Sequence, residues 1–278
     1  MLEILQLPFM QRAFLVGAIA AIPFGLIGTF VVVRRIGYLA GAIAHCAFGG
    51  IGIGLYLQHI LAGTLLAAFC PPIGVAVLVA ILSALLIGVI RIKAGEREDT
   101  IIGAVWAIGM AVGLLLFEMT PGNTNIANFL FGNILLISRT DILLVSILST
   151  VVLLLVFLFF KRLEAVCFDE EFARLRGIPT SFYFQLLLVL TAITVVLLVR
   201  IVGIVLVIAM LTLPAATACR LARRLLPICL LSVFLGFIST WLGLILSAAT
   251  DLTAGPTIVI TASLFYLISL LFPVAKNI

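Results

Sequence analysis

The chain has 278 residues, of which 65 % are hydrophobic and only 27 are charged, 16 basic and 11 acidic. Soluble domains average roughly 25 % charged residues, so this composition excludes a cytosolic enzyme, a nucleic-acid-binding domain and a secreted disulfide scaffold. The roughly 181 apolar residues could supply about nine bilayer-spanning helices of about 20 residues each. The composition therefore predicts an all-α polytopic membrane protein.

Long apolar runs bounded by charge predict the first spans. They cover residues 13–33, 37–57, 65–90 and 101–117. The third run contains Pro71 and Pro72, and a polar loop separates it from the fourth. The stretch 126–138 is short and amphiphilic, which is typical of a helix lying at the membrane surface rather than crossing it.

The later apolar runs cover residues 142–160, 182–218, 226–247 and 256–271. The run 182–218 is too long for one crossing and has basic clusters on both sides, so we expect a hairpin that turns near Arg200. The chain then has nine spans. Eight spans are the alternative, if the hairpin or the first run is counted differently.

The basic residues predict the orientation, because cytoplasmic loops carry an excess of Lys and Arg. With the N-terminus outside, all but three of the 16 basic residues fall on the cytoplasmic side. The three exceptions are Arg12, Arg139 and Arg200. This bias favours nine spans with an external N-terminus.

His45 is the clearest candidate site residue, because ionisable groups inside a membrane are costly and mark functional sites by default. It lies about two turns into the second predicted span, among small residues that let neighbouring helices approach closely. Imidazole is a common ligand of zinc and other divalent ions. His45 therefore either contacts a metal ion on a transport pathway or is hydrogen-bonded inside a packed bundle.

Motifs for catalysis are missing from the sequence. There is no HExxH, GxSxG or Walker A motif, and no Asp or Glu lies in mid-span. We therefore expect a chain that is not an enzyme and holds no cofactor. A proton-coupled pump is also disfavoured, so the energy for transport must come from a partner.

The polar segment 168–178 predicts a short cytoplasmic helix, since acidic residues open it and Arg, Gly and Pro close it. Phe168, Phe172 and Leu175 follow at spacings of four and three and form one apolar stripe. Such a helix either inserts into a groove of another protein or lies on its own bundle or on the lipid surface.

Four segments resemble known motifs. Residues 171–177 resemble the coupling loop E-A-A-x-x-x-G, with Phe172 in place of one Ala. Residues 35–52 resemble G-D-A-I-S-H-A-V-L-P-G, residues 97–103 resemble R-E-D-x-x-I-G, and residues 202–218 resemble V-G…P-A-A-T-A. In order and spacing, the chain resembles the membrane permeases of zinc- and manganese-type ABC importers.

This resemblance implies a type II ABC importer permease, a single domain over residues 1–278 in the cell membrane of a prokaryote. It implies a homodimer with the pathway at its interface, two cytoplasmic ATPase subunits and an extracytoplasmic solute-binding protein, with no nucleic acid partner. The segment 168–178 would be the coupling helix. Its positions toward the ATPase would be Asp169, Glu171, Ala173 and Gly177.

The resemblance also makes His45 the His of the family's metal-contacting D-x-x-x-H pair, but the chain departs from the motif around it. Gly41 stands at the Asp, Ala44 at the Ser and Gly49 at the Pro. Losing the carboxylate removes a charge that helps to dehydrate a divalent cation. Either His45 and its copy in a second protomer bind a zinc-like cation transiently, or the cargo differs.

Zinc or manganese is the cargo that the resemblance favours, and three alternatives stay open. The same kind of permease could carry a metal chelate or another small solute. A self-contained channel or secondary transporter would work without an ATPase. A structural membrane scaffold would leave His45 and the segment 168–178 unexplained.

Overall fold

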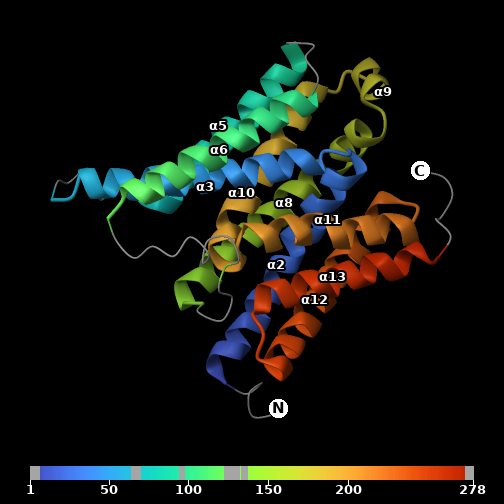
Figure 1. Ribbon diagram of the computed structural model, residues 1–278. Helices are drawn as coiled ribbons and strands as arrows, with labels where there is room; N and C mark the ends of the chain where they lie inside the picture. The colour runs from blue at the N-terminus through green and yellow to red at the C-terminus, as the bar shows by residue number, and fades with distance from the viewer. Residues whose placement is uncertain (1–6, 64–69, 94–97, 122–131, 133–136, 273–278) are drawn as a thin grey trace.

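The computed structural model describes residues 7–63, 70–93, 98–121, 132 and 137–272. Within these ranges every regular element is an α-helix (Figure 1). The helices are α2 (Pro8–Val33), α3 (Gly37–Ile60), α5 (Pro72–Lys93), α6 (Glu98–Met119), α8 (Arg139–Phe168), α9 (Glu170–Leu175), α10 (Thr180–Val202), α11 (Ile204–Leu221), α12 (Leu225–Thr250) and α13 (Ala254–Leu270).

Seven described helices are long and apolar enough to cross a membrane, namely α2, α3, α5, α6, α8, α11 and α12. Shorter apolar stretches occur in α10, over Thr180–Val196, and in α13, over Ala254–Leu270. Each predicted apolar run holds one of these helices, and the long run 182–218 holds two. The all-α membrane bundle that the sequence predicted is therefore confirmed.

The break in the run 182–218 falls at Gly203, three residues from Arg200, where the turn was expected, and Gly203 adopts a φ of 80°, which favours glycine. One boundary differs from the sequence-based expectation. α5 begins at Pro72, since proline is tolerated in the first turn, where its missing N–H is not needed. Most of the surface helix expected at 126–138 lies outside the described residues.

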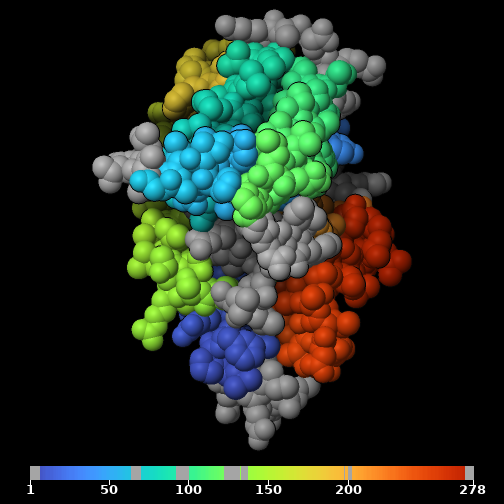
Figure 2. All heavy atoms as spheres, turned by 60° about the vertical axis from the view of Figure 1, so that its left-hand side comes forward, coloured from blue at the N-terminus to red at the C-terminus, as the bar shows by residue number. Residues whose placement is uncertain are grey.

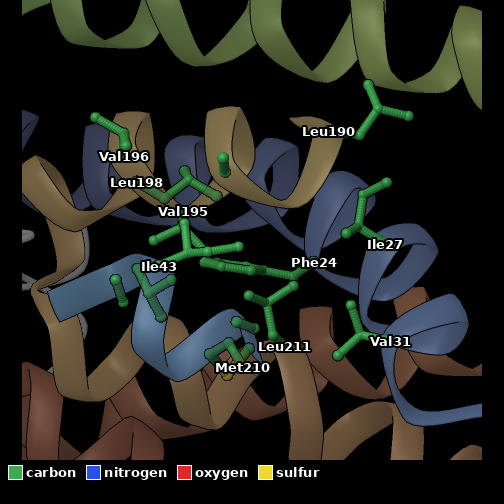
Figure 3. Packing of buried hydrophobic residues seen from close by; sticks show 14 of the residues in the cluster. Phe24, Ile27, Val31, Ile43, Leu190, Val195, Val196, Leu198, Met210 and Leu211 are labelled. Carbon is green, nitrogen blue, oxygen red and sulfur yellow. The ribbon is translucent and has the colours of Figure 1, made fainter. Parts of the chain in front are cut away.

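The bundle has two groups of helices. α2 packs against α8, α11 and α12, whereas α3 packs against α5 and α6. α10 joins the groups through contacts with α5, α8 and α3 (Figure 1). Figure 3 shows the core where α2, α3, α10 and α11 meet, filled by buried apolar side chains: Phe24, Ile27, Val31, Ile43, Leu190, Val195, Val196, Leu198, Met210 and Leu211.

Close helix contacts depend on glycine at two positions. A Cβ on Gly28 of α2 would overlap the Leu211 carbonyl oxygen of α11, and one on Gly49 of α3 would lie 2.6 Å from the Gly109 carbonyl oxygen of α6. In a membrane, helices associate by van der Waals packing of small residues, because lipid supplies no hydrophobic drive. Gly49, which stands where the motif has Pro, is therefore one of the close contact points between α3 and α6.

α8 differs from the other spanning helices in its length. It has 30 residues, from Arg139 to Phe168, and Ser138 and Asp141 form a capping box at its start. The expected span covered only residues 142–160, so α8 continues beyond the apolar run. Figure 1 shows α9, which follows α8, at one end of the bundle and the N-terminus at the other.

Candidate functional site

α3 and α6 run in the same direction and lie next to each other on the face that Figure 2 brings forward. Their register follows from two contacts: Gly109 faces Cys46, and Gly113 faces Gly52. The Cys46 thiol donates to the Val105 carbonyl oxygen at 3.4 Å. This register brings one face of α6 against the part of α3 that carries His45.

His45 is half-buried and lies eight residues after the start of α3, about 12 Å along the helix axis. Two side chains of α6, four residues apart and so on one face of the helix, cover its imidazole. The Trp106 ring stacks on the imidazole, with centroids 4.6 Å apart and planes at 24°. The Met110 Sδ lies 3.3 Å from His45 Nδ1.

These contacts do not satisfy the imidazole as a buried structural His requires. A thioether sulfur is a weak hydrogen-bond acceptor. His45 Nε2 has no hydrogen-bond partner among the residues that the structure describes. In the described part of the chain His45 is therefore not held by strong hydrogen bonds inside the bundle.

Trp106 also gives a physical reason for Gly41. A Cβ at Gly41 would lie 3.0 Å from Cζ3 and 3.3 Å from Cη2 of the Trp106 ring. A carboxylate at this position would push against the indole that stacks on His45. A hollow of about 340 Å³ lies beside this ring, lined by Tyr38, Ile102, Gly103 and Trp106.

One protomer does not hold a closed metal site in its described part. No group of three or more His, Cys, Asp or Glu side chains comes together in the described ranges. A structural zinc site has four ligands, usually Cys and His, and a catalytic site keeps three. The described residues of one protomer therefore do not by themselves supply the ligands of such a site.

α9 has well-defined ends. Asp169 is its N-cap, and its carboxylate accepts a hydrogen bond of 2.8 Å from the Phe172 N–H. Gly177, with a φ of 76°, ends it in a Schellman motif. There the Gly177 N–H donates to the Arg174 carbonyl, and the Ile178 N–H to the Ala173 carbonyl. Asp169 and Gly177 therefore fix the position of the helix.

α9 is also tied to the bundle. Ala173 is 1 % exposed and faces the neighbouring helices. Arg34, next to the end of α2, donates to the Glu170 carboxylate at 2.6 Å and to the Val166 carbonyl of α8 at 3.0 Å. The Arg34 side chain is only 10 % exposed. α2, α8 and α9 are thus joined by a single guanidinium group.

The opposite side of α9 is open. Phe168 and Phe172 are about half exposed and Leu175 is 81 % exposed, while Glu171 lies in solvent beside them. The predicted apolar stripe therefore does not cover its own bundle. Of the two alternatives to docking, this argues against a helix that covers its own bundle, and a helix on the lipid surface stays open beside docking on a partner. The structure places Asp169, Glu171, Ala173 and Gly177 within this one short helix and its caps, far along the chain from His45.

Sequence reasoning missed Arg34, Trp106 and Met110. Arg34 is 136 residues away from Glu170, so no local pattern could pair them. Trp106 and Met110 did leave a signal, because they share a face of the helix that follows the R-E-D-like motif. That signal was not enough to identify His45 as the side chain they cover.

Comparison with known proteins gives four findings. The profile of the ABC 3 transport family matches residues 6–273. A "probable metal transport system membrane protein" of Chlamydia pneumoniae is 39 % identical over 92 % of this chain and 86 % of its own. The manganese transport system membrane protein MntC of Listeria monocytogenes is 30 % identical over 97 % of this chain and 92 % of its own. The solved structure of PsaBC from Streptococcus pneumoniae with a Fab superposes with a TM-score of 0.85 at 31 % identity, covering 99 % of this chain and 96 % of that one.

Proposed function

This chain belongs to the ABC 3 transport family, and from this premise we propose that it is the permease through which an ABC importer carries a divalent metal cation, zinc or manganese. It is a multi-pass protein of a prokaryotic cell membrane. Relatives named for metal and manganese transport align with nearly all of its length, which supports a metal cargo.

The observation that carries the proposal is the exposed apolar stripe on α9. A capped helix held by a buried Arg and presenting Leu175 outward is suited to insertion into a groove of a partner. We assign that partner as a cytoplasmic ATPase subunit, with ATP hydrolysed there and none by this chain. A solute-binding protein delivers the cation at the outer face.

A second copy of the chain completes the pathway. One protomer offers His45 but no closed set of ligands in its described part, and two copies would place two imidazoles along one route. The homodimer is part of the proposal, as is the use of residues 1–278 as one permease domain. No cofactor takes part, because the chain only conducts the cation.

The coupling path runs from α9 into the bundle. When two ATPase subunits close on ATP, they move the helices docked on them. Arg34 passes a shift of Glu170 to α2, and α2 packs against α11 and α12 in the core. Movement of one helix group against the other opens or closes the route past His45, which is the gating role that conformational steps play in many transport and catalytic cycles.

The test is transport by proteoliposomes that contain the permease, its ATPase and its solute-binding protein. Labelled zinc and manganese should enter in an ATP-dependent way. Glu171→Lys and Gly177→Arg should lower both uptake and the stimulation of the ATPase. Unchanged assembly and stimulation in both variants would remove α9 from the coupling path.

The same assay tests His45. His45→Ala should reduce uptake, whereas His59→Ala at the exposed outer end of α3 is the matched control and should transport normally. Equal uptake by His45→Ala and the parent would show that the cation does not contact His45.

A further inference from the structure

We propose that Met110 and Trp106 join His45 in a contact site for a cation that accepts imidazole nitrogen and thioether sulfur, Zn²⁺ or Cu⁺, in preference to Mn²⁺. This inference rests on the proposed function, because it names the class of cargo on the same pathway, and it extends that class from divalent cations to the monovalent Cu⁺. It assigns a ligand role to Met110 and a shaping role to Trp106.

The choice of metal follows from the kinds of atom that would bind it. Thioether and imidazole donors suit copper and zinc, whereas Mn²⁺ favours carboxylate, carbonyl and water oxygens. α3 contains no Asp or Glu. The position where the family motif has Asp is Gly41, and the Trp106 ring occupies the space beside it. The site therefore lacks the hard oxygen donor of the family motif and offers a soft sulfur donor.

The spacing of the two donors fits one shared cation. His45 Nδ1 and Met110 Sδ are 3.3 Å apart. With bonds of about 2.0 Å to nitrogen and about 2.3 Å to sulfur, donors at this distance subtend about 100° at the ion. That angle is near the tetrahedral value, so the pair can bind a cation without moving α3 relative to α6.

Trp106 shapes the site in two ways. Its ring is 4.6 Å from the imidazole by centroids, so a cation at His45 lies near an aromatic face that attracts positive charge. The ring also borders the hollow of about 340 Å³. Tyr38, another lining residue, is seven positions before His45, roughly 10 Å toward the start of α3. The hollow thus offers a released cation a way toward the cytoplasmic end.

A packing role for Met110 makes a different prediction. Leu and Met have similar volumes, and exchanging them in a core usually costs less than about 1.5 kcal/mol. If the sulfur only fills space, Met110→Leu should behave as the parent does. If the sulfur binds the cation, the same variant should lose affinity while it keeps its fold.

Trp106 fluorescence provides a direct binding signal. The chain has two Trp residues, so Trp241→Phe leaves Trp106 as the reporter in the full chain in lipid nanodiscs. We expect Zn²⁺ or Ag⁺, a stable stand-in for Cu⁺, to change this fluorescence at concentrations at least about tenfold below those of Mn²⁺. Equal responses to Mn²⁺ and Zn²⁺ together with no response to Ag⁺ would overturn the assignment.

Matched variants in the same background identify the ligands. Met110→Leu and His45→Ala should each weaken the response at least about tenfold. Met119→Leu, an exposed Met of α6, and His59→Ala should leave it unchanged. A response that survives Met110→Leu but is lost in Cys46→Ala would assign the metal to the thiol and reject Met110.

Transport separates this inference from the proposed function. In the reconstituted importer, Met110→Leu should lower the ratio of zinc to manganese uptake while ATPase stimulation stays normal. ATP-dependent metal uptake with an unchanged ratio would overturn the inference alone. A wild-type importer without any ATP-dependent metal uptake would overturn the proposed function, whatever the fluorescence shows.

Discussion

Among the described residues, those around His45 carry almost no charge. In contrast, charged side chains and backbone hydrogen bonds hold α9 in place. At His45 the Trp106 ring stacks on the imidazole and the Met110 sulfur contacts its Nδ1. Asp169, Arg34 and Gly177 fix α9 by capping, an ion pair and a turn. Both regions resemble the same family, but only α9 keeps the residues that the motif requires for its shape.

The difference separates two tasks. A coupling helix must dock on its partner in one position. The residues that cap it and the residue that links it to the bundle must therefore all be kept together. A pathway inside a membrane is set by which side chains fill a small volume. Gly41 stands where the motif has Asp and the Trp106 ring occupies the space beside it, so on the proposed pathway the donor atoms differ while the helices stay in place.

The largest effect should come from forcing α3 and α6 apart. In Gly49→Val, the new Cβ lies 2.6 Å from a backbone oxygen of Gly109 that cannot swing away. We expect a loss of about 3 kcal/mol of stability, the upper end for overpacking. Thermal unfolding in detergent measures it. Gly103→Ala, where a Cβ meets nothing within 4 Å, should unfold like the parent, and equal unfolding of both variants would contradict the packing account of the membrane site.

The next effect should come from breaking the link between α2 and α9. Arg34→Ala removes hydrogen bonds to Glu170 and to the Val166 carbonyl. We expect the free energy of unfolding to fall by about 2 kcal/mol. Hydrogen bonds to charged groups contribute roughly 1.5–3 kcal/mol, and Glu170 is partly screened by solvent. The number of cations moved per ATP should fall while the ATPase still binds. The neighbouring Arg35 is exposed, so Arg35→Ala is the control, and normal coupling in Arg34→Ala would show that α9 transmits force by another route.

A smaller effect should come from the outer face of α9. Leu175 is 81 % exposed, so Leu175→Ser should change the stability of the permease by less than about 0.5 kcal/mol. It should weaken ATPase binding by about 1 kcal/mol or more if the residue is central to the interface. Affinity measured by biolayer interferometry in nanodiscs tests this. An unchanged dissociation constant would place the partner's groove elsewhere.

The smallest effect should appear in cargo preference. The double variant Gly41→Asp, Trp106→Ala places a carboxylate at position 41 and makes room for it. The ratio of manganese to zinc uptake should therefore rise a few-fold, which corresponds to a free-energy difference of less than about 1.4 kcal/mol. Gly41→Asp alone should transport poorly, because the ring blocks the carboxylate. If the single and double variants transport alike, Trp106 does not control this position.

Much of the fold could be predicted from the sequence, because apolar length and charge bias are local properties. These properties predicted the positions of the helices. They also predicted the short helix within 168–178, which the structure shows as α9 with its caps. The break near Arg200 was also expected, and the structure places it at Gly203, because a glycine allows the backbone turn.

The candidate site was less predictable, because its contacts join distant parts of the chain. His45 stood out as an ionisable group in an apolar run, but the neighbours that give it a chemistry come from another helix. The pairing of Arg34 with Glu170 depends on how α2, α8 and α9 meet in space. Such pairings follow from helix register and packing, which a single sequence does not contain.

The length of α8 has a consequence for how the cell must make this protein. Its 30 residues extend about 45 Å, against a hydrocarbon core of about 30 Å, so the turns after Lys161 carry α9 clear of the lipid. The half-exposed aromatic rings and Leu175 then face water until a partner covers them. An orphan permease therefore displays an apolar surface that invites aggregation and quality control. On the proposed docking role of α9, synthesis of the ATPase in step with the permease would keep this surface covered.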